Sequence, residues 1–128
     1  MNGLVIDTSA WVSYLAGGGR PELVEPALED DRALLPPVVA AELLSGKMSP
    51  RQRRALMALL DDVILLQADQ EHWYRVGDLR AALAAHGLVV STPDAHVAQC
   101  ALDLGADLLT EDAIFSRMAS EVPLRLVR

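Results

Sequence analysis

The segment Leu4-Val5-Ile6-Asp7-Thr8-Ser9 joins a short apolar run to an acid and two hydroxyl residues. The apolar run has the composition of a buried β-strand, and Asp, Thr and Ser favour the start of a helix. Trp11, Tyr14 and Leu15 follow at helical spacing, so a helix is predicted directly after the strand. Asp7 is therefore expected at a junction between a strand and a helix.

The same alternation of short apolar runs and helical segments continues along the chain. Further strands are predicted at 33–35, 63–66, 107–109 and 124–127, and helices at 21–29, 38–45, 50–60 and 112–118, with two more beginning near Asp69 and Thr92. Short apolar strands between helices are typical of a parallel sheet covered on both faces. We expect an α/β fold, a three-layer α/β/α sandwich with a central parallel sheet of four to five short strands. Residues 1–128 are expected to form a single domain.

The apolar positions of the two long helices predict which faces they bury. The helix after Asp69 places Val76, Leu79 and Leu83 on one face, and the helix after Thr92 places Val97, Ala101 and Leu104 on another. His72, His86 and His96 are expected at the surface. Cys100 is interpreted as a small buried hydrophobe, and Trp11 and Trp73 as aromatics of the core or of a dimer interface.

The overall charge excludes a protein that holds nucleic acid by bulk electrostatics. The 128 residues include 18 Asp and Glu against 11 Lys and Arg, so the formal net charge is −7. A single cysteine cannot form an internal disulfide, and no signal-peptide pattern precedes the first strand. No apolar run approaches the roughly 18 residues of a membrane span. We therefore expect a cytoplasmic protein without a membrane association.

Three acids are isolated in otherwise uncharged stretches. Asp7 is the only charged residue in 1–19, Glu42 the only one in 34–46, and Asp94 the only one in 81–102. Two of these acids, Asp7 and Asp94, lie at predicted helix starts, and so does a fourth acid, Asp112. At such a position a carboxylate can simply cap backbone N–H groups. Glu42 lies beyond the first turn of its helix, and its simplest interpretation is an exposed side chain of an amphipathic helix.

Taken as a set, the four acids suggest a metal site instead. Ligands of a doubly wound sheet bind beyond the carboxyl ends of the strands, where Asp7 and Asp112 are expected. Carboxylates without a Cys or His pair favour Mg²⁺ or Mn²⁺ over zinc. Two such ions, about 4 Å apart, can activate water and stabilise the leaving oxygen in phosphodiester hydrolysis. Spacing alone leaves both the capping and the metal interpretations open.

Four sequence motifs resemble those of the PIN-domain ribonucleases, most closely the VapC toxins of type II toxin–antitoxin modules. The motifs are Leu-Val-Ile-Asp-Thr-Ser-Ala-Trp around Asp7, Val-Val-Ala-Ala-Glu-Leu-Leu-Ser-Gly around Glu42, Thr-Pro-Asp-Ala-His around Asp94, and Leu-Leu-Thr-Glu-Asp-Ala-Ile-Phe around Asp112. They occur in order and with similar intervening lengths over nearly the whole chain. One departure is Ile114, where many relatives carry a further acid.

This resemblance implies an endoribonuclease that uses Mg²⁺ or Mn²⁺ to cleave structured RNA such as tRNA or rRNA. Asp7, Asp94 and Asp112 would bind metal, Glu42 would complete the catalytic cluster, and the hydroxyls of Ser9 and Thr110 would orient the carboxylates. It also implies a homodimer that is inhibited by a cognate VapB-like antitoxin in a heterotetramer or larger complex. The Ile114 departure leaves one metal ion or two as alternatives.

A cluster of basic residues offers a candidate RNA-contacting surface. Four of the eleven basic residues lie within eight positions of the sequence: Lys47, Arg51, Arg53 and Arg54. An acidic protein that binds RNA needs such a local patch. The alternative is a solvated helix face.

Other functions remain as alternatives. A PIN-domain nuclease of RNA processing, outside a toxin module, fits the same motifs, and so does a PIN-like module that binds a partner without catalysis. A phosphoacceptor receiver domain is a poor match, because it needs a lysine after its fifth strand and no lysine follows Lys47.

Overall fold

A computed structural model describes residues 2–127. In chain order the elements are β1 (Leu4–Ile6), α1 (Thr8–Leu15), α2 (Pro21–Glu29), β2 (Ala33–Leu35), α3 (Pro37–Ser45), α4 (Pro50–Asp61), β3 (Ile64–Leu65), α5 (Gln70–Ala85), α6 (Thr92–Leu104), β4 (Asp107–Leu109), α7 (Ile114–Ala119) and β5 (Arg125–Leu126). The five strands form one parallel sheet, which confirms the expected fold class.

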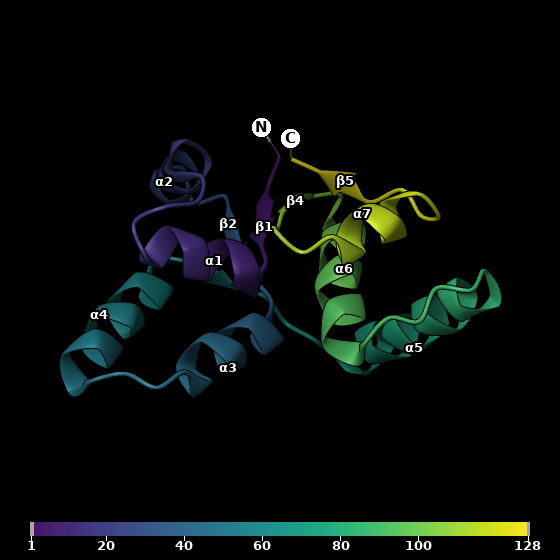
Figure 1. Cartoon of the computed structure of the whole chain (residues 1–128), viewed down its shortest axis with the longest axis horizontal. Coiled ribbons are helices and arrows are strands. Elements are labelled where there is room, and N and C mark those ends of the chain that lie inside the picture. Colours follow the sequence, from purple (N-terminus) through teal and green to yellow (C-terminus); the bar gives the residue numbers. More distant parts are fainter. Residues whose placement is uncertain (1, 128) are drawn as a thin grey trace.

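The sheet order β3-β2-β1-β4-β5 places the first strand at the centre (Figure 1). The chain builds outward from β1 to β3 on one side, and returns to build β4 and β5 on the other. The strand order therefore reverses between β1 and β4, which pair with Ile6 opposite Leu109. In such sheets the reversal point opens a crevice at the carboxyl ends of the two strands, and Asp7 and Thr110 follow those ends directly.

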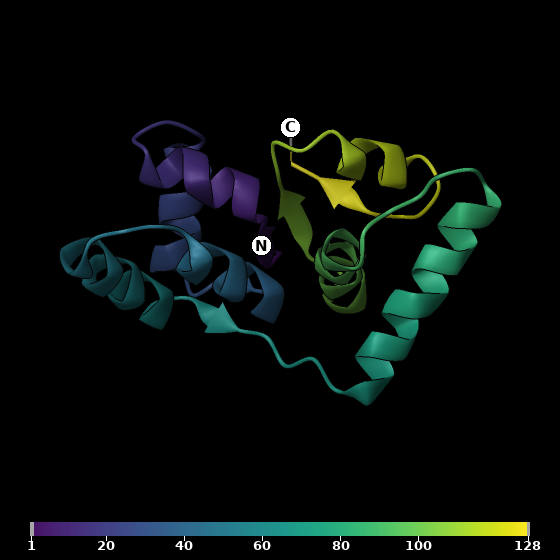
Figure 2. The same cartoon turned by 60° about the horizontal axis from the view of Figure 1, so that its bottom comes forward.

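Helices cover both faces of the sheet (Figure 2). In Figure 1, α1, α2, α3 and α4 lie to the left of β1, and α5, α6 and α7 lie to its right. α6 packs on β1 and β4, whereas α5 packs on α6 and lies farther from the sheet. α6 is thus enclosed between the sheet and another helix, and its residues 95–101 are all buried.

The enclosed position of α6 corrects the sequence prediction for two histidines. His96 is fully buried and His72 is only 3 % exposed, so the prediction that both lie at the surface is wrong. The face of α6 that turns away from Asp94 lies against α5 instead of solvent. His86, by contrast, is exposed, and Cys100 is buried as expected.

The apolar core agrees with most of the predicted faces. Trp11, Val76, Leu79, Leu83, Val97 and Ala101 are all buried. Leu104 is an exception, because it lies in the last turn of α6 and is 55 % exposed. Gly105 then adopts a left-handed conformation (φ 59°) that ends the helix and leads the chain into β4.

Several predicted elements differ in detail from the structure; the strand predicted at 124–127, for example, is only Arg125–Leu126. The strand predicted at 63–66 is only Ile64–Leu65, and both residues are exposed because β3 is an edge strand. The helix predicted from Asp112 begins at Ile114. Among the described residues, no helix combines the length and apolarity that a membrane crossing requires.

Candidate active site

Asp7 lies at the carboxyl end of the central strand and is 6 % exposed. Its Oδ2 accepts hydrogen bonds from Ser9 Oγ and from Thr110 Oγ1, both at 2.9 Å. Asp7 occupies the N-cap position of α1, but its side chain makes no capping hydrogen bond. The simple capping interpretation is therefore wrong for this residue. Its negative charge is buried against two hydroxyls instead.

The two hydroxyls are themselves fixed by the backbone of the loop after β4. Glu111 N–H donates to Ser9 Oγ at 2.9 Å, and Asp112 N–H donates to Thr110 Oγ1 at 3.0 Å. An acceptor site of each hydroxyl is thus occupied, which leaves its proton for Asp7. The expected role of Ser9 and Thr110 in orienting a carboxylate matches these contacts.

Asp112 is exposed, and its Oδ1 accepts the N–H of Ile114 at 3.0 Å. This bond lies at the start of α7 and agrees with the capping interpretation. The position of Asp112 is nevertheless tied to the rest of the cluster, because its own N–H bonds Thr110. The carboxylate of Asp112 can thus accept a hydrogen bond at the start of α7 and still lie near the other acids.

Asp94 lies in the first turn of α6, where Ser91 is the capping residue. Ser91 Oγ accepts the N–H of Asp94 at 3.2 Å, so Asp94 is not itself the cap. Burial raises the pKa of the Asp94 carboxyl, and the negative charges of Asp112, Asp7 and Glu42 raise it further, while the Ser91 hydroxyl opposes them. All three other acids are therefore close enough to repel Asp94.

Glu42 projects from α3 and is exposed, but it is not free. Thr8 Oγ1 donates a hydrogen bond to Glu42 Oε1 at 2.8 Å. Sequence analysis did not identify Thr8 as a site residue. Its position directly after Asp7, at the start of a helix, is the available signal, because that turn faces the same edge of the sheet.

The four acids come from four separate segments, and the charges of the other three act on Asp94 near the switch point of the sheet. Four carboxylates in one region repel each other and favour protonation. A hard divalent cation with oxygen ligands reverses this preference, and the donor set matches such an ion. Burial is the main cause of the raised pKa of Asp94 and the three other acids add to it, so a cation beside Asp94 would favour its ionised form.

A hollow of about 680 Å³ extends from Glu42 between α1, α3 and α4. Its walls are mainly apolar and include Val12, Leu15, Leu43, Met48 and Leu56. Val12 and Leu15 are 55 % and 47 % exposed, an unusual degree for large apolar side chains. An apolar groove therefore leads directly to one acid of the cluster.

The structure separates the four basic residues of the candidate RNA surface. Lys47 lines the groove near Glu42. Arg51, Arg53 and Arg54 are exposed on α4 and do not line it. Only one of the four is thus placed next to the acids, and the other three extend the positive charge outward along the helix.

Comparison with known proteins agrees with this architecture. Residues 4–121 match the model of the PIN domain family. The chain is 32 % identical over 122 residues to VapC ribonuclease Mb1587 of Mycobacterium bovis and to ribonuclease VapC11 of Mycobacterium tuberculosis, with 91 % of each chain covered. The chain belongs to the PIN-domain family and, within it, to the VapC ribonucleases.

Solved VapBC structures share the fold at lower identity. VapBC2 of Rickettsia felis, bound to a DNA fragment of its promoter, aligns with a TM-score of 0.78 and 21 % identity, covering 97 % of this chain and 96 % of that one. The DNA-bound VapBC of Salmonella typhimurium aligns with the same TM-score and identity, covering 99 % and 98 %. The VapC fold is therefore retained over the whole described chain.

Proposed function

We propose that this protein is a Mg²⁺- or Mn²⁺-dependent endoribonuclease and the toxin of a type II toxin–antitoxin pair. The observation that supports it most is that the charges of Asp7, Glu42 and Asp112 all act on Asp94, in a chain of the VapC family. Structured RNA such as tRNA or rRNA is the proposed substrate, and the homodimer is the proposed active form.

Asp7, Asp94 and Asp112 are the proposed metal ligands. Two hydroxyls engage Oδ2 of Asp7, so its Oδ1 is assigned to the cation. The bound ion would polarise the scissile phosphate and lower the pKa of a coordinated water. Ser9 and Thr110 hold the carboxylate of Asp7 in one orientation.

Glu42, which projects from α3, completes the proposed catalytic cluster. Thr8 engages Oε1 of Glu42, which leaves Oε2 to orient the attacking water. Ile114 occupies the position of the additional acid found in many relatives. We therefore assign the chain one tightly bound ion, and place Glu42 beside it as an acceptor for the water proton.

The apolar groove beside Glu42 is the proposed binding site of the antitoxin. A helix or strand with apolar side chains would cover Val12 and Leu15, and a basic residue on it would neutralise the acids. The same segment would block RNA from the site. Coexpression with the cognate antitoxin tests this, since Val12→Asp should weaken that complex without abolishing RNA cleavage.

Isothermal titration with Mn²⁺ tests the metal assignment without relying on catalysis. Wild-type protein should bind the ion, and Asp94→Asn should weaken binding at least tenfold. A nuclease of RNA processing would also bind the ion but would form no complex with an antitoxin. A PIN-like module without catalysis would bind RNA and leave it intact.

A further inference from the structure

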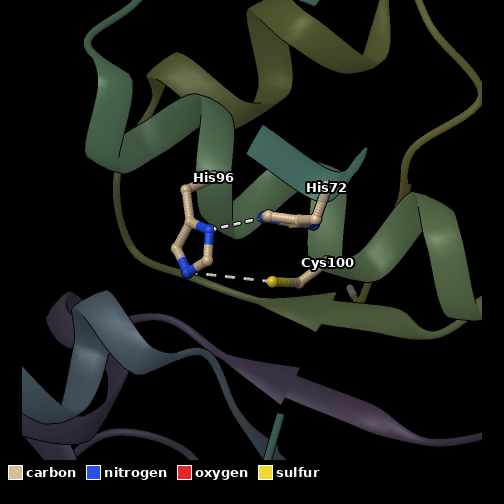
Figure 3. Close-up of side chains that lie close together, drawn as sticks. All are labelled: His72, His96 and Cys100. Carbon is tan, nitrogen blue, oxygen red and sulfur yellow. Dashed lines mark hydrogen bonds between the residues drawn. The ribbon is translucent and has the colours of Figure 1, made fainter. Parts of the chain in front are cut away.

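Three soft or borderline ligand side chains meet in the interior, on α5 and on α6, the helix whose first turn also carries Asp94. His72 comes from α5, and His96 and Cys100 lie one turn apart on α6 (Figure 3). His72 Nε2 lies 2.7 Å from His96 Nδ1, and His96 Nε2 lies 3.9 Å from Cys100 Sγ. All three residues are buried.

We propose that His72, His96 and Cys100 bind a zinc-like divalent transition metal at a site separate from the carboxylate cluster. Imidazole nitrogen and thiolate sulfur are the ligands that zinc and cobalt prefer, whereas Mg²⁺ and Mn²⁺ prefer oxygen. The two sites would therefore select different metals. This proposal is independent of the ribonuclease activity.

The environment of His72 is arranged as it is around metal-bound histidines. His72 Nδ1 lies 3.1 Å from Asp103 Oδ2. Asp103 accepts two further hydrogen bonds from Arg75, at 3.0 and 2.9 Å, and one from Gln99 at 2.8 Å. A carboxylate held in this way keeps the proton on Nδ1 and leaves Nε2 with a lone pair that can bind a metal.

The distances also suit a tetrahedral site. One ligand atom from each of the three residues lies within 4.8 Å of the others. Tetrahedral zinc with bonds of about 2.0 to 2.3 Å requires ligand atoms roughly 3.3 to 3.8 Å apart. Side-chain shifts of under about 1 Å are therefore sufficient.

Solvent can reach the cluster from one side. A surface hollow of about 320 Å³ is lined by His72, Cys100 and Asp103, among others. This opening gives a metal ion an entry path and supplies water as a fourth ligand. The indole of Trp73 stacks on the His96 ring, with 4.6 Å between centroids, and covers the cluster elsewhere.

Binding of the metal replaces the proton of the thiol by a coordinate bond between sulfur and the metal. Burial raises the pKa of Cys100 to about 12, and nearby Asp103 adds to this shift. Without metal the cluster therefore holds a thiol. On binding, the S–H bond breaks, a sulfur–metal bond forms and the thiol proton passes to solvent. His96 keeps its single proton on the ring nitrogen that does not bind the metal.

Cobalt titration of the full chain tests the proposal directly. Cys100 is the only cysteine, so any thiolate-to-cobalt charge-transfer band reports on this residue alone. Wild-type protein should develop that band together with the visible bands of tetrahedral cobalt at one ion per chain. Zinc added afterwards should displace cobalt and bleach both signals.

Matched variants separate this site from other metal ligands. Cys100→Ser should lose the charge-transfer band and bind cobalt at least tenfold more weakly, whereas His86→Gln, at an exposed histidine, should keep both. Asp94→Asn should keep the band as well. A folded wild-type protein that shows no thiolate band would overturn the proposal, even if Cys100→Ser cannot be folded. Equal cobalt affinity of wild type and folded Cys100→Ser would overturn it too.

Discussion

Thr110 Oγ1 donates a hydrogen bond to Asp7 Oδ2 at 2.9 Å across a sequence separation of 103 residues. This contact joins the loop after β4 to the end of β1, at the point where the strand order reverses. Together with Ser9 it surrounds one oxygen of a buried carboxylate with hydroxyl donors. The two ends of the domain thus cooperate to position one charged group.

Removing either hydroxyl should reduce RNA cleavage without abolishing it. Thr110→Val and Ser9→Ala each leave Asp7 in place but free it to rotate, and groups that orient metal ligands typically contribute about 10- to 100-fold. Single-turnover cleavage of RNA with Mg²⁺ measures the loss. Ser120→Ala, at an exposed serine of the same chain, serves as the control. Unchanged rates in both site variants would show that these hydroxyls do not position Asp7 for catalysis.

Asp94→Asn should stabilise the metal-free protein at neutral pH. The folded protein raises the pKa of Asp94, so the carboxylate destabilises the folded state wherever it is ionised. That destabilisation fades as pH falls through the raised pKa toward the ordinary range of an aspartate. The thermal midpoint of the variant should therefore exceed that of wild type at neutral pH, and the difference should shrink in acid.

Thermal denaturation in a chelator, over a series of pH values, measures this difference. Asp78→Asn is a matched control, because it removes an exposed aspartate from α5. A control variant that gains as much stability as Asp94→Asn would mean that the effect reflects net charge alone. A lower midpoint for Asp94→Asn at neutral pH would contradict the cost of burying the Asp94 charge and of its repulsion by the other acids.

Mn²⁺ should reverse the order of stability between these proteins. A ligand present at 100 times its dissociation constant stabilises the folded state by about 2.7 kcal/mol. Wild type should gain about this amount, and Asp94→Asn, with binding at least tenfold weaker, should gain at most about half of it. Thermal midpoints with and without Mn²⁺ measure the gain. An equal gain in both proteins would place the ion away from Asp94.

The exposed arginines of α4 should contribute to RNA affinity through phosphate charge. Arg53→Ala combined with Arg54→Ala should weaken binding and reduce the slope of log affinity against log salt by about 1 for each phosphate that is no longer neutralised. Filter binding in the catalytically inactive Asp7→Asn background measures this slope. Arg75→Gln combined with Arg125→Gln makes the same change in net charge at other surface ion pairs. If both double variants show the same salt dependence, the arginines of α4 contribute no more to RNA binding than other surface charges do.

The strand–helix units were predictable from sequence because they depend on local patterns. The catalytic role of the four acids stays a prediction. Asp7 and Thr110 each follow a short apolar strand, and parallel strands bring such positions to one edge. The capping interpretation applies to Asp112 but fails for Asp7 and Asp94. Short-range sequence does not reveal that Ser9 and Thr110 engage Asp7, nor that Ser91 already caps α6.

The incorrect predictions of burial arise where packing between helices, which the sequence pattern does not show, decides whether a residue is buried. His96 lies two residues after Asp94 and turns away from it, which suggests solvent, yet α5 covers that face. His72 is buried for the same reason, in the first turn of α5. Leu104 keeps the helical spacing of its face but extends past the sheet at the end of α6. Periodicity identifies a face and cannot identify what lies against it.

Single-turnover RNA cleavage by wild type, Asp7→Asn and Asp94→Asn tests the central claim most directly. With Mg²⁺ or Mn²⁺, wild type should cleave a structured RNA, a chelator should stop the reaction, and each variant should be slower by about 100-fold or more, as expected for the loss of a metal-binding charge. RNA binding should persist in both variants. Equal cleavage by all three proteins, or cleavage that survives the chelator, would contradict the assignment of these carboxylates to a catalytic metal site.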